Sequence, residues 1–406
     1  MVSHDHPTPS LADDHLTLDE LGPRLVRISG VLGLIGLGAA VALGAARGDG
    51  FQSFGWSYLL SFAFFLSLSL GALFLVAVGH VTGAVWNVVS RRLAEVTAAN
   101  LTTLALLAVP VLVLAHRIMP WAAGTSHAPA ELLEHKAAFL DLEFFYVRWV
   151  IYFAIWCGYA WWFWKRSAEQ DTSGDPALSV RMSRKSGLCL LLFALSVSFA
   201  SYDLLMSLDP SWFSTMFGPY FFAGSFLAFM CFLTLMTFWL QSRGRVRQVI
   251  HVEHLHDYGK LIFAFVFFWA YLAFSQYMLI WYANIPEETA WFLARQSNGW
   301  GWLGLTLVFG HFLIPFAGLL AQKAKRRRPS LLFWAVWILV MHWIDLYWIV
   351  MPQWRPSAPT LDWLDLLTFV GIGGIFIAGI GRLASSHSLV PIRDPRIDDS
   401  LAFENT

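Results

Sequence analysis

Ten separate runs of about 20 mainly apolar residues constrain this chain more than any other feature of its sequence. A helix of that length crosses the hydrocarbon core of a bilayer, which is ~30 Å thick. Only 13% of the 406 residues are charged, against about 25% in soluble domains, and the mean hydropathy is +0.57. The sequence therefore predicts an all-α integral membrane protein with ten transmembrane helices. The runs cover 25–46, 56–79, 93–116, 144–164, 187–208, 217–241, 261–283, 300–321, 331–350 and 363–382.

Lys and Arg indicate how the helices are oriented, because short cytoplasmic loops hold them in excess. With both termini in the cytoplasm, the dense basic run at 323–328 lies inside. The sequence thus predicts cytoplasmic tails at 1–24 and 384–406 around a membrane domain at 25–383, and the second tail is expected to stay extended unless bound. The basic residues that then lie outside are Arg47, Arg117, Lys136, Arg148, Arg295 and Arg355.

Cysteine spacing and net charge exclude several cofactors and partners. Cys157, Cys189 and Cys231 stand alone in apolar runs, so they form no cluster that holds zinc, iron–sulfur or covalently attached haem. We therefore expect no cofactor in this chain. The formal net charge is zero, and nothing indicates a nucleic-acid partner.

A carboxylate inside an apolar run occurs twice in the same setting. Y-D-L-L-M-S-L-D-P-S-W at 202–212 and W-I-D-L-Y-W-I-V-M-P-Q-W at 343–354 both contain D-L, five residues, then P-x-W, which pairs Asp203 with Asp345. Pro and Trp near helix ends are common in unrelated spans. A charged side chain in hydrocarbon costs a few kcal/mol and seldom persists without a role, so the repeated Asp carries the argument.

The two Asp residues lie on the fifth and ninth spans, which run in the same direction. This predicts a parallel repeat of two four-helix bundles. Spans two to five form the first bundle, at about 56–208, and spans six to nine form the second, at about 217–350. Spans one and ten flank them.

This layout resembles the membrane subunits of the polysulfide reductase and nitrite reductase D type. The stretch 251–288 contains H-D-Y-G-K-L-I-F-A-F-V-F-F-W-A-Y-L-A-F-S-Q-Y-M-L-I-W-Y-A-N-I-P-E-E. It resembles, more narrowly, the ActF membrane protein of alternative complex III, a bacterial quinol oxidoreductase of respiratory or photosynthetic electron transport.

The resemblance implies a place in a multisubunit complex of the bacterial inner membrane. The expected partners are a sibling ten-span subunit and periplasmic subunits that carry c-type haem and iron–sulfur clusters. Quinol chemistry is implied nearby, and quinol is a possible ligand of this chain, although the family's quinone site is placed on the sibling subunit.

Titratable residues inside the spans suggest a proton pathway. His342 lies three residues before Asp345 on one helical face, and His311 lies at similar depth on the eighth span. A relay needs titrating groups within hydrogen-bond reach, directly or through water. Two alternatives stay open. The histidines can form hydrogen bonds that only hold the bundle together, or they can ligate a b-type haem, which the tryptophan-rich ninth span disfavours.

The fifth span places hydroxyl groups before Asp203. Ser198, Ser201 and Tyr202 lie on this span. They line a water-filled path on one reading, and on the other the serines bond to their own helix backbone. Both readings remain open. Burial at this depth favours the neutral form of a carboxyl group, which suits proton exchange.

Arg148, near the outer end of the fourth span, is the natural cationic partner for Asp203 or for the acidic pair Asp141 and Glu143. Gln276 and Tyr277 lie at comparable depth on the seventh span, where we expect a second polar pocket with Asp345. The candidate proton-pathway residues are Asp203, Asp345, His342, His311, Arg148, Tyr202, Ser198, Ser201, Gln276 and Tyr277.

A secondary transporter or proton-coupled permease is the alternative function, because transporters also use repeats and intramembrane charges. The sequence has no pair of Gly- or Pro-interrupted spans at matching midplane positions, and the repeat is parallel with four-span units. Both features favour the complex subunit.

Overall fold

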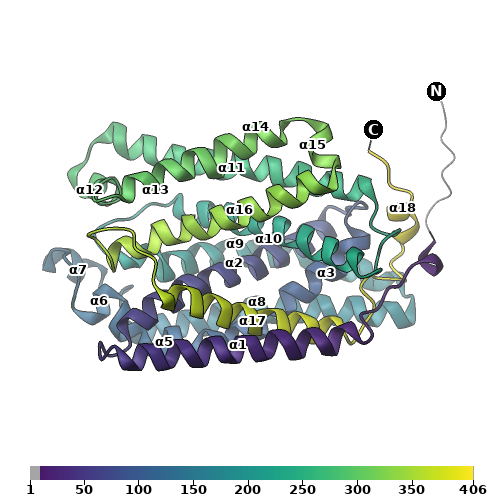
Figure 1. The fold of residues 1–406 in the computed structure, drawn as a ribbon, viewed down its shortest axis with the longest axis horizontal. Coiled ribbons are helices and arrows are strands. Elements are labelled where there is room, and N and C mark those ends of the chain that lie inside the picture. Colours follow the sequence, from purple (N-terminus) through teal and green to yellow (C-terminus); the bar gives the residue numbers. More distant parts are fainter. Residues whose placement is uncertain (1–9, 406) are drawn as a thin grey trace.

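The protein is described by a computed structural model that covers residues 10–405. Within that range the chain forms helices joined by loops, with no β-strand. Residues 1–9 of the predicted N-terminal tail and Thr406 of the predicted C-terminal tail lie outside it. The long helices run roughly parallel to one another along the longest axis of the molecule (Figure 1).

Eight helices are long and uninterrupted, and two further runs are divided into segments. The long helices are α1 (Leu21–Ala46), α2 (Gln52–Val81), α8 (Leu142–Ser173), α9 (Pro176–Leu204), α10 (Phe217–Ser242), α11 (Val252–Ala283), α16 (Arg328–Val350) and α17 (Trp363–Ala384). The divided runs are α3 (Val88–Ala99), α4 (Leu101–Leu107) and α5 (Val109–Ile118), and α13 (Trp300–Thr306), the π-helix η3 (Leu307–Leu313) and α14 (Ile314–Leu320). Short helices are η1 (Leu11–Asp13), α6 (Pro120–Ala123), α7 (Ala130–Lys136), η2 (Met206–Leu208), α12 (Pro286–Ala294), α15 (Gln322–Arg326), η4 (Met351–Gln353) and α18 (Ile397–Leu401).

The apolar helices support a multi-pass membrane protein. Within the described range, eight helical runs are long and apolar enough to cross a membrane, or nine if the run α3–α5 counts as one span despite a 49° bend. Pro110 explains the bend, because proline at the second position of α5 lacks a backbone N–H. The remaining predicted span falls on α8, which has 32 residues but is rich in Trp and Tyr and ends in a polar turn.

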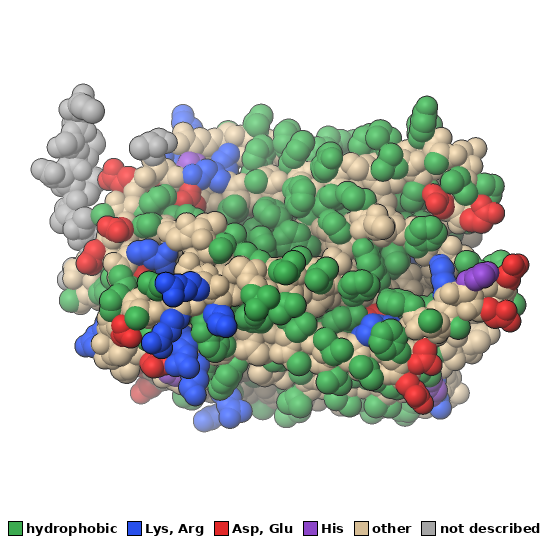
Figure 2. Space-filling view, turned by 180° about the vertical axis from the view of Figure 1, so that it is seen from behind, with side chains coloured by type: hydrophobic (Ala, Val, Ile, Leu, Met, Phe, Trp, Pro, Cys, Tyr) green, Lys and Arg blue, Asp and Glu red, His purple; other side chains and the backbone are tan. Residues whose placement is uncertain are grey.

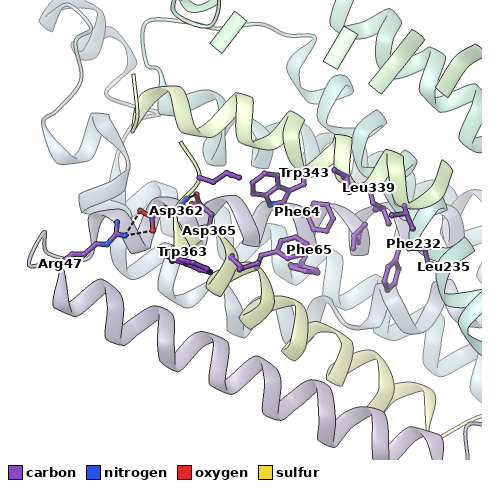
Figure 3. A pocket seen from close by; sticks show the side chains of 16 residues that line it. Arg47, Phe64, Phe65, Phe232, Leu235, Leu339, Trp343, Asp362, Trp363 and Asp365 are labelled. Carbon is purple, nitrogen blue, oxygen red and sulfur yellow. Dashed lines mark hydrogen bonds and ion pairs between the residues drawn. The ribbon is translucent and has the colours of Figure 1, made fainter. Parts of the chain in front are cut away.

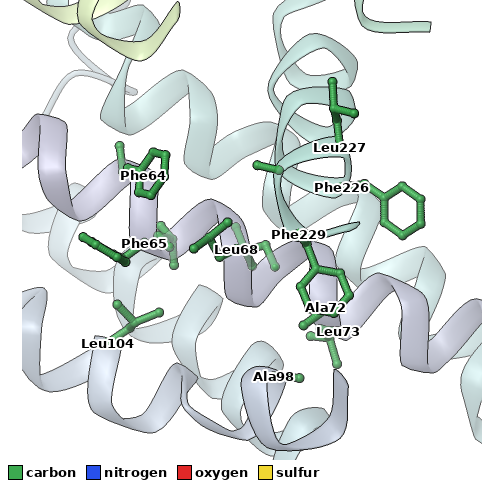
Figure 4. Close-up of a cluster of buried hydrophobic side chains, with 14 of the residues drawn as sticks. Phe64, Phe65, Leu68, Ala72, Leu73, Ala98, Leu104, Phe226, Leu227 and Phe229 are labelled. Carbon is green, nitrogen blue, oxygen red and sulfur yellow. The ribbon is translucent and has the colours of Figure 1, made fainter. Parts of the chain in front are cut away.

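Helix α2 lies at the centre of the fold and is buried along almost its whole length. It packs against α3, α9, α10 and α17. Figure 4 shows aromatic and aliphatic side chains filling the space between α2 and its neighbours, with Phe64, Phe65 and Leu68 on α2 and Phe229 on α10 among them. A Cβ added to Gly71 would lie 2.5 Å from the Ser225 carbonyl oxygen, so glycine permits the close approach of α2 and α10.

Helices α1 and α17 form a closely packed pair through small residues. A Cβ on Gly374 of α17 would lie 2.5 Å from the Cα of Gly33 on α1. Small residues at such a crossing let two backbones approach and gain van der Waals contact, which is the main attraction between helices in lipid. The pair joins the rest of the fold chiefly through the packing of α17 on α2.

Charged residues are sorted between the two ends of the helices (Figure 2). Lys and Arg gather at the end where α1 begins and α17 ends, which we call the basic end. The opposite end, where α9 and α16 end, shows mainly Asp and Glu and is called the acidic end. Sorting of this kind is typical of membrane proteins, in which one side of the bilayer carries the positive excess.

Buried ion pairs occupy the basic end. Arg91 Nε lies 3.1 Å from Glu95 Oε1, and Arg91 Nη2 lies 2.6 Å from Asp394 Oδ2. Arg92 Nη2 lies 2.7 Å from Asp171 Oδ2. All members of this network except Asp171 are almost fully buried, so the charges compensate one another instead of facing solvent.

The C-terminal segment packs against the basic end, which corrects the expectation of an extended tail. Its buried apolar side chains are Leu389, Val390, Ile397 and Leu401. His254 Nε2 lies 2.9 Å from the Ser400 carbonyl oxygen, and Asp394 reaches Arg91. The expectation was wrong because it relied on the absence of helical periodicity. A segment without periodicity can still pack, and here a few buried apolar side chains and the Asp394 carboxylate hold it against the helices.

Candidate functional site

The two repeated aspartates have different surroundings. Asp203 lies one residue before the end of α9 and is 1% exposed. Arg148 of α8 donates from Nε to Oδ2 at 2.8 Å and from Nη2 to Oδ1 at 2.7 Å. Tyr152, one turn further along α8, donates its hydroxyl to Oδ2 at 2.8 Å. Asp203 is therefore a buried carboxylate with a bidentate cationic partner.

Arg148 is itself held in place by other groups. Its Nη2 also donates to the Phe139 carbonyl oxygen at 2.9 Å. Its guanidinium lies 4.1 Å from the ring centroid of Phe139 and 4.4 Å from that of Phe144. Of the two partners expected for this arginine, the structure selects Asp203. The Asp141 carboxylate instead caps α8 by accepting from the Phe144 N–H.

Asp345 has no such cation. It lies on α16 and is 2% exposed. Its Oδ1 is hydrogen-bonded to the Tyr220 hydroxyl of α10, and its Oδ2 accepts from Trp269 Nε1 of α11 at 3.2 Å. Within the described part of the chain, no Lys, Arg or His forms an ion pair with it. Two neutral donors therefore surround a deeply buried acid.

His342 lies one turn before Asp345 and points across to α2. Its Nε2 lies 2.9 Å from the hydroxyl oxygen of Ser67, whereas no hydrogen-bond partner for its Nδ1 lies among the described residues. Close approach to α10 depends on Gly224, because a Cβ there would lie 3.2 Å from the His342 ring. The side chain thus connects α16 with both α2 and α10.

His311 lies within the π-helical segment η3. Pro315 accounts for this irregularity, since it lacks the N–H that would bond to the His311 carbonyl in a regular α-helix. The imidazole is fully buried, and its ring centroid lies 3.9 Å from that of Trp269. Neither ring nitrogen has a hydrogen-bond partner in the described range. Trp269 therefore links His311 to Asp345 by contact on one side and a hydrogen bond on the other.

The serines predicted to line a path bond to their own helix. Ser198 donates to the Ala194 carbonyl at 2.8 Å, and Ser201 donates to the Ser198 carbonyl at 2.7 Å. Local side chain to backbone bonds of this kind satisfy a hydroxyl in an apolar helix. Of the two readings that the sequence left open, the structure shows the serines bonded to their own helix backbone.

The predicted pocket of Gln276, Tyr277 and Asp345 also does not form. Gln276 Oε1 accepts from Ser214 at 2.8 Å, and the Tyr277 hydroxyl accepts from Gln296 at 3.3 Å. Tyr202 donates its hydroxyl to the Thr215 carbonyl at 3.0 Å. Each of these three residues bonds to a loop of the acidic end instead of to Asp345 or Asp203.

Three residues of the site were missed from sequence: Tyr220, Trp269 and Arg295. Arg295 is 1% exposed and donates to the carbonyls of Trp291, Trp348 and Ile349 at 2.8–3.2 Å. No ion-pair partner for it lies in the described part of the chain. The only sequence signal for it is an isolated basic residue in an outer loop.

Arg295 lies beyond Asp345 toward the acidic end. It binds the carbonyl of Ile349, four residues after Asp345, which corresponds to about 6 Å along the helix. Carbonyl groups at a helix C-terminus carry the negative end of the helix dipole and stabilise a cation. A fixed positive charge therefore sits about one turn outside the buried acid.

The two copies of the repeated motif share a local shape. Each helix is followed by a short 3-10 turn, η2 after α9 and η4 after α16. Each motif also ends in a stacked tryptophan. The ring centroids of Trp212 and Trp291 lie 4.2 Å apart, and those of Trp354 and Trp56 lie 6.1 Å apart. Asp203 and Asp345 lie one and five residues before the ends of their helices. The repeat itself remains a prediction.

Residues 10–405 contain no group of three or more His, Cys, Asp or Glu side chains that could hold a metal ion. What the site offers is a carboxyl group, a phenol, an indole and two imidazoles in a buried interior, a set that suits proton transfer better than ligation. No protein-family model matches this chain, and a search of the curated proteins finds no match to it.

Proposed function

We propose that this chain is a ten-span subunit built from two four-helix bundles, with α8 as the span that hydropathy alone does not identify. Mutual packing of α2, α3, α8 and α9, and of α10, α11, α14 and α16, supports two bundles, with α1 and α17 flanking them. Both ends of the described chain lie at the basic end, which supports a cytoplasmic location for the tails and a periplasmic location for the acidic end.

The function that best fits these features is that of a cofactor-free subunit in a quinol-oxidising complex of the alternative complex III type. The resemblance of 251–288 to the ActF membrane protein supports it. In such a complex, partner subunits carry the c-type haem and iron–sulfur clusters, and a sibling ten-span subunit accompanies this chain in the bacterial inner membrane. This chain then contributes to proton translocation coupled to quinol oxidation.

Asp345 is the proton carrier in this proposal. An ionised carboxylate buried without a cation costs several kcal/mol, so the resting form of Asp345 is the neutral acid. Tyr220 and Trp269 hold it in place without fixing its charge. The unpaired nitrogens of His311 and His342 are positions where buried water completes the hydrogen bonding and extends the path inward.

Asp203 has a structural role in this scheme, because the bidentate Arg148 holds its carboxylate in the charged form. Arg295 acts as an electrostatic barrier outside Asp345. A fixed cation in a low-dielectric path raises the energy of a proton that approaches from the acidic end. It therefore slows proton passage between Asp345 and the acidic end in both directions, which limits passive leak through the bundle.

A secondary transporter fits less well. Transporters of the repeat type break corresponding helices in both halves to form a central site. In this chain the interrupted runs are α3–α5, the second helix of the first bundle, and α13–α14, the third helix of the second bundle. They do not correspond under a four-span repeat.

Co-purification tests the proposal. The tagged chain is isolated from native membranes in mild detergent, and its companions are identified by mass spectrometry and optical spectroscopy. Subunits with c-type haem and iron–sulfur clusters are expected in fixed ratio to the chain. A chain that purifies alone and catalyses solute uptake in vesicles would contradict it.

The observation that motivates the proton-carrier role is the burial of Asp345 without a cation.

A further inference from the structure

An apolar furrow opens on the side of the molecule between α16 and α17 (Figure 3). Its volume is about 890 Å³, and α2 and α10 form its floor through Phe64, Phe65 and Phe232. A second hollow of about 240 Å³ continues from it toward the basic end and shares Phe232 and Leu235. The two together follow α17 along most of its length.

Charged groups line the furrow only at its acidic end. Asp362 Oδ1 and Oδ2 each lie 2.7 Å from Arg47 Nη2. The side chains of this pair are 23% and 33% exposed, so both remain accessible from the rim. Below them the lining side chains on α2, α10 and α16 are uncharged, and the indole N–H of Trp343 is their one hydrogen-bond donor. A charged ligand group that entered further would lose its hydration without gaining a countercharge.

The other carboxylate at the rim has no free acceptor. The Asp365 carboxylate accepts four hydrogen bonds. The donors are Ser57 Oγ at 2.5 Å, Arg355 Nη1 and Nη2 at 2.8 and 3.3 Å, and the Asp362 N–H at 2.9 Å. A buried quinol head would need an unoccupied partner of this kind. The furrow therefore accepts hydrocarbon chains along its length and a headgroup only at its rim.

We propose that this furrow is the binding site of one phospholipid with a zwitterionic headgroup, from the leaflet at the acidic end. Its phosphate lies near Arg47, its amine lies near Asp362, and its acyl chains lie against Phe64, Phe65 and Phe232. An anionic headgroup fits less well, because the rim carries two carboxylates that already balance the two arginines. The inference rests on the membrane location of the helices and not on proton transfer.

The bound lipid also explains how the flanking pair α1 and α17 is held to the second bundle. Helix α17 packs mainly on α1 and α2, and α16 is not among its main packing partners. Acyl chains in the furrow contact both helices at once. The acyl chains supply the dispersion contacts between α16 and α17 that an empty furrow would lack.

Lipid retention tests the site directly. The wild-type protein, in the form isolated from membranes, is exchanged into nanodiscs containing equal amounts of phosphatidylethanolamine and phosphatidylglycerol and released for native mass spectrometry. One retained phosphatidylethanolamine per chain is expected. A retained quinone, preferential retention of phosphatidylglycerol, or no retained lipid would each overturn the proposal.

Two tryptophan substitutions on α16 provide a matched comparison. Val340 lines the furrow and is 50% exposed, whereas Leu332 is 43% exposed on the same helix and does not line it. Val340→Trp should fill the space and lower lipid retention at least tenfold, while Leu332→Trp should leave it unchanged. Equal retention in both variants would place the lipid elsewhere. If Val340→Trp fails to fold, the wild-type preference between the two lipids still decides.

Discussion

Replacing Arg148 with Met should be among the most destabilising single changes in the chain. Methionine replaces the aliphatic stem of the arginine with another unbranched chain but has no guanidinium. The substitution therefore removes two of the three hydrogen bonds that Asp203 accepts. It leaves a 1% exposed carboxylate with Tyr152 as its only remaining donor. Removing one partner of a buried pair costs about 3–5 kcal/mol. Lost cation–π contacts with two phenylalanine rings add about 0.5–2 kcal/mol.

A double-mutant cycle separates the ion pair from other effects. In Arg148→Met with Asp203→Asn no buried charge remains, so the cost should be roughly 2–3 kcal/mol smaller than the sum of the single variants. Unfolding in detergent micelles, followed by tryptophan fluorescence, measures each variant. Arg166→Met is the control, because its pair with Glu169 is exposed and contributes at most about 1 kcal/mol. A cost for Arg148→Met as small as that of the control, or strict additivity in the cycle, would refute the reasoning.

Three further changes test other parts of the structure. Tyr220→Phe removes the hydroxyl that binds Asp345 and should lower proton translocation in vesicles without loss of assembly. Arg295→Gln keeps polar donors but removes the fixed charge, so dye measurements should show faster proton leak, and an unchanged leak would exclude the barrier. Asp394→Asn should cost about 2 kcal/mol at pH 7, because Arg91 opposes the desolvation of Asp394 and lowers its pKa to about 2 from an ordinary value near 3.8. A lowered pKa stabilises the fold above pH ~4, and this contribution is lost as the pH falls through about 2, so wild type and variant should converge in acid. A constant difference across pH would contradict the ion pair.

Eight or nine of the ten predicted spans coincide with helical runs long and apolar enough to cross a membrane, because hydrocarbon thickness imposes a length that few other structures require. The sequence limited the partner of Arg148 to Asp203 or to the pair Asp141 and Glu143, because a charge in an apolar run has few candidates at its own depth, and the structure shows the pair with Asp203. The run at 144–164 was predicted as mainly apolar and lies within α8, whose Trp and Tyr lower its hydropathy.

The surroundings of Asp345 could not be read in the same way. Tyr220 and Trp269 are aromatic residues in a chain with 16% aromatics, so only packing distinguishes them from their neighbours. The serines near Asp203 had two possible partners, and proximity favoured the backbone of their own helix. The ion pair of Asp394 with Arg91 could not be predicted either. It joins residues 303 positions apart in the sequence, and helical periodicity predicts only contacts within one helix.

The proton yield of the complex carrying Asp345→Asn is the most direct test of the proton-carrier role. Asparagine keeps the shape and a hydrogen-bonding group at this position but cannot titrate. In reconstituted vesicles we expect the variant complex to assemble, to oxidise quinol, and to translocate fewer protons per quinol than the wild type. Glu134→Gln, which changes an exposed carboxylate of α7 at the same end, outside both the proposed path and the furrow, should give the wild-type yield. A wild-type yield for Asp345→Asn would contradict the account and leave Asp345 as a packing residue.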